Sequence, residues 1–212
     1  MFGIPGPEDN VIVVTGDSIA SHLTDFAFDA AQTSTVLEDF FPADPSGKSV
    51  KLINNATGGA TIARVMNRLD SDCLRYNPDI AIINGGTNDL NHGDVSQEDY
   101  IDAWRSILDA CDRHGVIVVV LRIVPSTYLS NERMRERDRW NAALKSLVES
   151  HEGFIYCDAG PYVGQYRDGG DPDNLWDIQP DLDIGDGVHY MQAGYNLIAL
   201  AILDSMEPLK QR

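Results

Sequence analysis

Three side chains in the sequence occupy settings that suit nucleophilic catalysis. Ser18 lies where a short apolar run gives way to a helical pattern, so its hydroxyl can face a crevice and its N–H lies near a helix N-terminus, which favours negative charge. Asp186 and His189 stand three residues apart just before the last predicted helix. A carboxylate bonded to an imidazole fixes its tautomer and stabilises its charged form. Taken alone, a serine at this position is more often a helix N-cap than a nucleophile.

Two further polar loops follow predicted strands. Residues 54–61 read Asn-Asn-Ala-Thr-Gly-Gly-Ala-Thr, and residues 85–90 read Gly-Gly-Thr-Asn-Asp-Leu. Glycine in the first loop permits close approach of the backbone to a bound group. Gly, Asn and Asp are also ordinary turn residues, so neither loop identifies a site by itself.

The elements that must position these residues alternate between short apolar β-rich runs and helical patterns. Strands are predicted at 11–14, 50–53, 79–83, 116–124 and 154–157, and helices at 19–31, 60–69, 96–114, 131–150 and 192–206. Strands that are apolar throughout, each followed by a helix, indicate a parallel sheet covered on both faces. The sequence therefore predicts an α/β fold, a flavodoxin-like three-layer α/β/α domain with a five-stranded parallel sheet. Its ligand crevice lies beyond the carboxyl ends of the strands.

Together and in this order, four segments resemble the blocks of the SGNH (GDSL-type) hydrolase family. Residues 16–19, Gly-Asp-Ser-Ile, match the first block, with Ile where Leu is usual. Gly59 matches the second-block glycine, and Gly58 is an alternative. Residues 86–89, Gly-Thr-Asn-Asp, match the third block, and residues 186–189, Asp-Gly-Val-His, match the last. The resemblance covers nearly the whole chain, from about residue 10 to 206.

The resemblance implies a role for each residue. Ser18 is expected to be the nucleophile, His189 the general base, and Asp186 the group that orients His189. The N–H groups of Ser18 and Gly59 and the side-chain amide of Asn88 are expected to form the oxyanion hole. Asp17 and Asp89 are expected to brace their loops and not to touch substrate.

The implied activity is hydrolysis of carboxylic esters through an acyl-enzyme, with no metal and no organic cofactor. A small chain without an apolar lid segment favours short acyl groups, such as acetyl on a sugar. The expected partner is a small-molecule ester. The alternative from another class is a carbohydrate-binding or scaffold domain that keeps the fold without turnover.

The net charge of the chain excludes some classes of binding partner. The chain has 212 residues, 16 Lys plus Arg against 33 Asp plus Glu, and a net charge of −17. That charge argues against nucleic acid and anionic lipid as partners. The length and 43% hydrophobic content predict one domain over 1–212, with its core at about 10–206. The acidic surface also suits a salt-adapted protein, and the oligomeric state is left open.

The N-terminus, the apolar runs and the cysteines indicate the cellular compartment, and two charged segments have expected structures of their own. The N-terminus has no basic start and the longest apolar runs are too short for a membrane span, which predicts a cytoplasmic protein unless a signal has been removed. Three cysteines without CxxC spacing predict reduced, buried thiols. The acidic loop at about 160–185 is expected to be solvated; it could also bind calcium, although its spacing is not that of an EF-hand. Its Tyr162, Tyr166, Leu175 and Trp176 could line the substrate site or pack the loop down. The charged run 132–139 is expected to be a solvated helix face.

Overall fold

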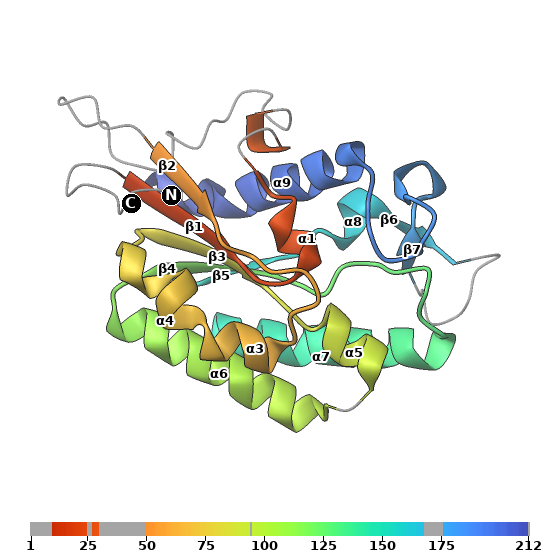
Figure 1. The fold of residues 1–212 in the computed structure, drawn as a ribbon, viewed down its shortest axis with the longest axis horizontal. Coiled ribbons are helices and arrows are strands. Elements are labelled where there is room, and N and C mark those ends of the chain that lie inside the picture. Colours follow the sequence, from red (N-terminus) through yellow and green to blue (C-terminus); the bar gives the residue numbers. More distant parts are fainter. Residues whose placement is uncertain (1–9, 25–26, 30–49, 94, 168–175, 212) are drawn as a thin grey trace.

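The structure is a computed structural model that describes residues 10–24, 27–29, 50–93, 95–167 and 176–211. Its centre is a parallel sheet of five strands in the order β2-β1-β3-β4-β5 (Figure 1). The strands are β1 (Asn10–Thr15), β2 (Val50–Asn54), β3 (Ile80–Asn84), β4 (Ile117–Leu121) and β5 (Ile155–Cys157). This is the flavodoxin-like strand order, so the predicted fold class is confirmed.

Helices cover both faces of the sheet (Figure 1). One layer contains α3 (Ile62–Asn67), α4 (Leu69–Asp72), α6 (Gln97–Arg113) and α7 (Asn131–Glu149), and the other contains α1 (Ser18–Ser21), α8 (Gly160–Val163) and α9 (Gln192–Met206). The described residues also contain the short helix α5 (Thr87–His92), the 3-10 helices η2 (Leu74–Tyr76), η3 (Pro180–Leu182) and η4 (Glu207–Gln211), and a helical turn at 27–29.

Alternation along the strands creates two separate cores. In β1, Ile12 and Val14 face the core beneath α9, whereas Val11 and Val13 face the core beneath α3 and α6. All four are almost fully buried. Because successive strand side chains point to opposite faces, a run that is apolar throughout is the pattern of a sheet covered on both sides.

The predicted helix over 19–31 is wrong in its middle. Helix α1 ends at Ser21, residues 22–24 are not helical, and helix resumes at 27–29. The side chain of Asn54, at the end of β2, donates to the carbonyls of Ala20 (2.8 Å) and Leu23 (3.0 Å). A residue from a neighbouring strand therefore satisfies carbonyls that the end of the helix leaves free.

The predicted strand over 116–124 is too long by three residues at its end. The side chain of Asn141 on α7 accepts from Ile123 N and donates to Ile123 O, both at 2.9 Å. These two bonds take the Ile123 backbone away from the sheet, so β4 stops at Leu121.

The long segment after β5 is more structured than the sequence indicated. It contains α8 and an antiparallel pair, β6 (Gly164–Tyr166) with β7 (Trp176–Ile178). Tyr162 donates to Asp204 at 2.6 Å, and the Tyr166 ring packs edge-on against Trp176. These contacts favour the alternative in which the aromatic side chains pack the loop down, and not the one in which they line the substrate site. Leu175 and the Asp-rich stretch 168–174 lie outside the described residues.

One charged side chain departs from the expected solvated helix face. Arg137 on α7 is fully buried and donates to the carbonyl of Trp176 at 3.0 Å and to Asp138 at 2.9 Å.

The three cysteines are buried and free, as predicted. Within the described ranges, no helix is both long and apolar enough to cross a bilayer, and no group of three His, Cys, Asp or Glu residues is arranged to hold a metal ion.

Candidate active site

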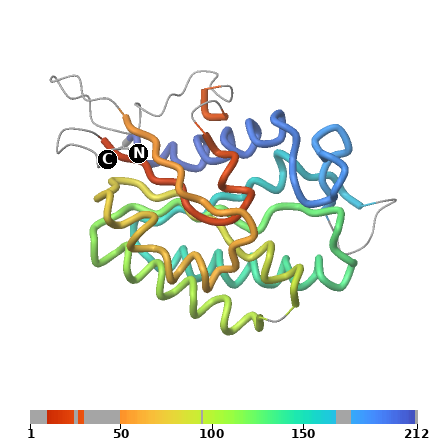
Figure 2. The backbone as a smooth tube through the Cα atoms, in the orientation of Figure 1, coloured from red at the N-terminus to blue at the C-terminus, as the bar shows by residue number. Residues whose placement is uncertain are grey.

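Ser18 sits at the carboxyl end of β1, where the chain turns into α1 (Figures 1 and 2). Gly16 makes the turn with φ +145°, and a Cβ there would overlap the side chain and carbonyl of Asn84. Asp17 caps α1, since its Oδ1 accepts from Ile19 N at 2.8 Å. The turn thus presents Ser18 as the first residue of the helix, with glycine required behind it.

The structure brings Ser18, His189 and Asp186 into one hydrogen-bonded chain. His189 Nε2 lies 2.8 Å from Ser18 Oγ, and His189 Nδ1 lies 2.7 Å from Asp186 Oδ2. A carboxylate at Nδ1 assigns the ring proton to that nitrogen, which leaves Nε2 free to accept the serine proton. This arrangement can deprotonate the Ser18 hydroxyl.

Asp186 is held as a carboxylate by donors on its own turn. Its Oδ1 accepts from Val188 N (2.9 Å) and His189 N (2.8 Å). Partial burial raises its pKa, but these backbone hydrogen bonds and the His189 ring outweigh that effect and lower the pKa to about 2. The group is therefore ionised wherever the imidazole can work.

The turn that contains Asp186 and His189 is fastened to the segment after β4. Gly187 O accepts from Ser126 Oγ (2.7 Å) and from Tyr128 N (3.0 Å). Tyr190, buried behind the turn, donates to Pro125 O at 2.6 Å. Neither Ser126 nor Tyr128 was predicted to belong to the site. The one hint in the sequence is that both follow the end of a predicted strand, where the crevice lies.

A short hairpin sets the direction of the His189 side chain. Asp183 and Tyr190 form an antiparallel bridge, and Ile184 N donates to His189 O at 3.3 Å. Ile184 is therefore a backbone neighbour of His189, and its side chain is 54% exposed.

The expected amide donors lie on the two neighbouring strand-end loops. Asn88, on the first turn of α5, donates through Nδ2 to Ala60 O at 2.9 Å, which ties α5 to the second loop. Gly59 has φ +71°, and a Cβ there would meet nothing within 4 Å. A Cβ on Gly58 would lie 3.9 Å from the Ser18 Cβ, so Gly58 is a direct neighbour of the serine side chain.

Two buried carboxylates lie under these loops and do not contact the crevice. Asp89 accepts from Ile62 N with both oxygens, at 3.2 and 3.0 Å. Asp17 exchanges hydrogen bonds with Asn84, the last residue of β3. Burial raises the pKa of both carboxyl groups. Sequence reasoning missed Asn84, because a lone Asn at a strand end is an ordinary turn residue.

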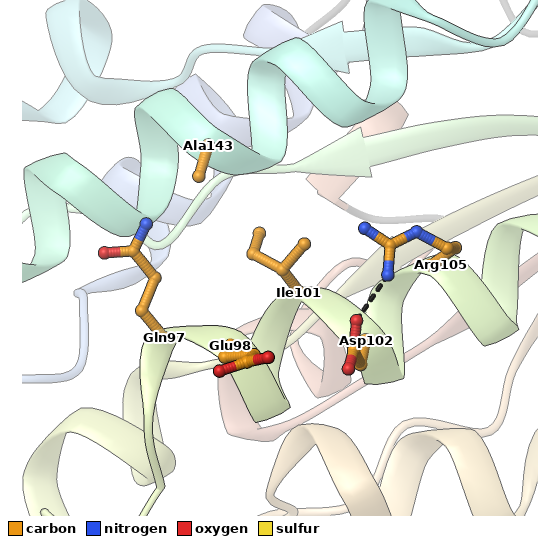
Figure 3. A pocket seen from close by; sticks show the side chains of 6 residues that line it. All are labelled: Gln97, Glu98, Ile101, Asp102, Arg105 and Ala143. Atoms are coloured by element: carbon orange, nitrogen blue, oxygen red, sulfur yellow. Dashed lines mark hydrogen bonds and ion pairs between the residues drawn. The ribbon is translucent and has the colours of Figure 1, made fainter.

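A surface hollow in the described part of the chain lies elsewhere. It measures about 590 Å³ and is lined by Gln97, Glu98, Ile101, Asp102 and Arg105 of α6 with Ala143 of α7 (Figure 3). Asp102 and Arg105 pair with each other across its edge. None of Ser18, Asp186 or His189 lines it, so it is unrelated to the hydrogen-bonded chain described above.

The chain matches one protein-family model and resembles several solved structures. The family model described as "GDSL-like Lipase/Acylhydrolase family" matches residues 14–197. No protein of curated function matches the sequence. A GDSL-like lipase from Bacteroides thetaiotaomicron has a similar structure, with TM-score 0.70, 19% identity, and 98% of this chain and 92% of that chain covered.

A second similar structure is a catalytic mutant of an acetylxylan esterase from Geobacillus stearothermophilus. Its TM-score is 0.71 at 16% identity, with 93% of this chain and 94% of that chain covered. In three catalytic mutants of that esterase, a serine, a histidine or an aspartate is replaced by alanine. At these identities the likeness establishes a shared fold.

Proposed function

The chain belongs to the GDSL-like lipase/acylhydrolase family of carboxylic ester hydrolases, and on that premise we propose that Ser18, His189 and Asp186 are its catalytic triad. The observation that carries the proposal is the contact of 2.8 Å between His189 Nε2 and Ser18 Oγ. The replaced aspartate of the Geobacillus esterase stands three positions before the replaced histidine, which is the spacing of Asp186 and His189 here.

In the proposed acylation step, Ser18 Oγ attacks the ester carbonyl carbon while His189 Nε2 takes the hydroxyl proton. The carboxylate of Asp186 stabilises the imidazolium that forms. When the tetrahedral intermediate collapses, the bond to the alkoxy oxygen breaks and His189 returns the proton to that oxygen. Water then attacks the acyl-enzyme, again giving its proton to His189, and the acid leaves as Ser18 recovers the proton.

The oxyanion of the intermediate is proposed to accept hydrogen bonds from Ser18 N, Gly59 N and the Asn88 amide. An amide NH₂ carries two hydrogens, so the bond from Asn88 to Ala60 O leaves one for the oxyanion and fixes the orientation of the group. A preorganised donor of this kind contributes about 3 kcal/mol to transition-state stabilisation. The contact of Gly58 with Ser18 keeps Gly58 N as an alternative to Gly59 N.

The proposed substrates are esters of short acyl groups, with acetyl on a carbohydrate as the leading candidate. The acetylxylan esterase fold neighbour supports this choice. The leaving oxygen must come within reach of His189 Nε2. Ile184, whose N–H donates to His189 O and whose side chain is exposed, is proposed to contact the alcohol part of the ester. No feature of the described residues favours the alternative of a non-catalytic binding domain.

The test is hydrolysis of p-nitrophenyl acetate and its longer acyl homologues by wild type and Ser18→Ala. We expect wild-type kcat/KM to be highest for acetyl and to fall with acyl length, and Ser18→Ala to be inactive on every ester. Equal rates for the two proteins would remove Ser18 as nucleophile. A maximum at long acyl chains would retain the nucleophile and reject the short-acyl proposal.

A further inference from the structure

We propose that Asn84 is a positioning residue that holds the Ser18 turn in place through the buried Asp17; this inference rests on the proposed role of Ser18. Asp17 N donates to Asn84 Oδ1 at 3.1 Å, and Asn84 Nδ2 donates back to Asp17 Oδ1 at 3.1 Å. The two residues stand 67 positions apart in the chain. Their side chains are buried, with 0% and 1% exposed.

The position of Asn84 explains how it can act on the turn. β1 and β3 are adjacent parallel strands in which Thr15 pairs with Ile83, so Asn84 lies beside the turn that begins at Gly16. A Cβ on Gly16 would overlap Asn84. The turn therefore passes directly over this side chain, and any shift of Asn84 moves the backbone that leads into Ser18.

The chemistry suits an amide at this position. Asp17 offers a backbone donor and a carboxyl acceptor to the same partner, and the Asn84 amide meets them with an acceptor and a donor on separate atoms, at any protonation state of its surroundings. The Asp17 oxygen that Asn84 binds is also the one that caps Ile19 N. One carboxylate oxygen thus anchors both the turn and the first turn of α1, on either side of Ser18.

Asn84 also links the turn to the expected oxyanion residue. It is followed by Gly85 and Gly86 and then by α5, whose first turn contains Asn88. The backbone of Asn84 therefore belongs to the loop that presents Asn88, while its side chain is bonded to the loop that presents Ser18. A displacement of about 1 Å between such groups can cost about 10²-fold in rate.

Asn141 provides a matched control within the same molecule. It is also a buried Asn, 4% exposed, and it also exchanges two hydrogen bonds with one backbone segment, at Ile123. Its two hydrogen bonds go to the segment after β4, whereas those of Asn84 go to the Ser18 turn. A loss of stability alone should appear in variants of either residue, whereas a loss of Ser18 positioning should appear only in variants of Asn84.

The first experiment compares the pH dependence of kcat/KM for Asn84→Asp and Asn141→Asp. In Asn84→Asp the new carboxyl can keep its contact with Asp17 only while the pair shares a proton. Loss of that proton leaves two carboxylates in contact, in surroundings that also contain the ionisable groups of Asp89, Tyr100, His189 and Tyr195. We expect Asn84→Asp to lose activity toward higher pH, or across the whole range, whereas wild type and Asn141→Asp hold a plateau. A profile of Asn84→Asp that matches Asn141→Asp would overturn the inference.

The second experiment compares Asn84→Ala with Asn141→Ala by rate of labelling with a fluorophosphonate and by melting temperature. Both should melt lower than wild type, and Asn84→Ala alone should label about 10²-fold more slowly. Equal labelling rates for the two variants would overturn the inference while leaving the nucleophile intact. If wild type itself is not labelled, the role of Ser18 fails, and the role of Asn84 fails with it. If Asn84→Ala does not fold, the comparison of pH profiles still decides.

Discussion

His189 Nε2 lies 2.8 Å from Ser18 Oγ, although 171 positions separate the two residues in the chain. Ser18 is placed by the turn after β1, and His189 by a hairpin that leads into α9. The second ring nitrogen of His189 contacts Asp186. Two turns that are far apart in the sequence thus place the serine hydroxyl and the imidazole at a distance suited to proton transfer.

Replacement of His189 should abolish activity about as completely as replacement of Ser18, because the two groups act as one unit. An imidazolium cannot accept the serine proton, so a histidine base also predicts lower wild-type activity in acid. The measurement is kcat/KM for p-nitrophenyl acetate from about pH 5 to 8. A flat profile over that range would argue against a histidine base.

Asp186→Asn should reduce kcat by up to about 10⁴-fold, because the amide favours the wrong imidazole tautomer.

Asp186→Asn should also change the stability of the folded protein in acid. The pKa of Asp186 is lowered from 3.8 to about 2, so its contribution is present above about pH 4 and is lost as pH falls through about 2. Urea midpoints should therefore fall less steeply for Asp186→Asn than for wild type over that interval. Parallel curves would contradict the lowered pKa.

Asn88→Ala should lower kcat about 10²- to 10³-fold if its amide binds the oxyanion. Stability should fall by only about 1 kcal/mol, from loss of the bond to Ala60 O. Asn55→Ala is the matched control, since the Asn55 amide also donates to one backbone carbonyl, that of Asp72, at 2.8 Å. A similar kcat loss in both variants would reduce the role of Asn88 to support of the loop.

Asp17→Asn should become more stable relative to wild type as pH rises. Burial raises the pKa of Asp17 above 3.8, so the folded protein loses stability as pH increases from about 4 through the folded-state pKa. An amide retains Oδ1, which accepts both hydrogen bonds, and replaces Oδ2, which has no partner in the described structure. Urea midpoints from about pH 4 to 8 measure the difference. A difference that is constant with pH would contradict the raised pKa.

Ile184→Ser should raise KM for acetate esters of bulky apolar alcohols, such as benzyl acetate, by about tenfold, given the value of a buried aliphatic side chain. Methyl acetate is the internal control, since it forms the same acyl-enzyme but has almost no alcohol surface. Equal changes for both esters would show that Ile184 does not contact the alcohol.

The fold was predictable because its signals are local. The run 11–14 within β1, apolar at every position, indicates a sheet covered on both faces. The helix predicted over 96–114 is observed as α6, with Ser96 as its N-cap accepting from Asp99 N. The errors arose where a distant side chain decides the outcome. Asn54 accounts for the interruption after α1, and Asn141 for the end of β4, and neither contact can be inferred from local pattern.

The site divides in the same way. The proposed triad of Ser18, Asp186 and His189 was predicted from blocks of adjacent residues, and the structure places these side chains within hydrogen-bonding distance of one another. Asn84 was missed because its partner is 67 positions away. The burial of Arg137 was not predicted, because a charged helical run has the same spacing whether one of its members faces water or, as here, the carbonyl of Trp176 in β7.

The most direct test of the account is to locate the residue that a fluorophosphonate modifies. Wild type, Ser18→Ala and His189→Ala would be incubated with the probe, digested, and mapped by peptide mass spectrometry. The account predicts a single adduct on Ser18 in wild type, none in Ser18→Ala, and much slower labelling in His189→Ala. An adduct on a different serine, or equal labelling of all three proteins, would contradict it.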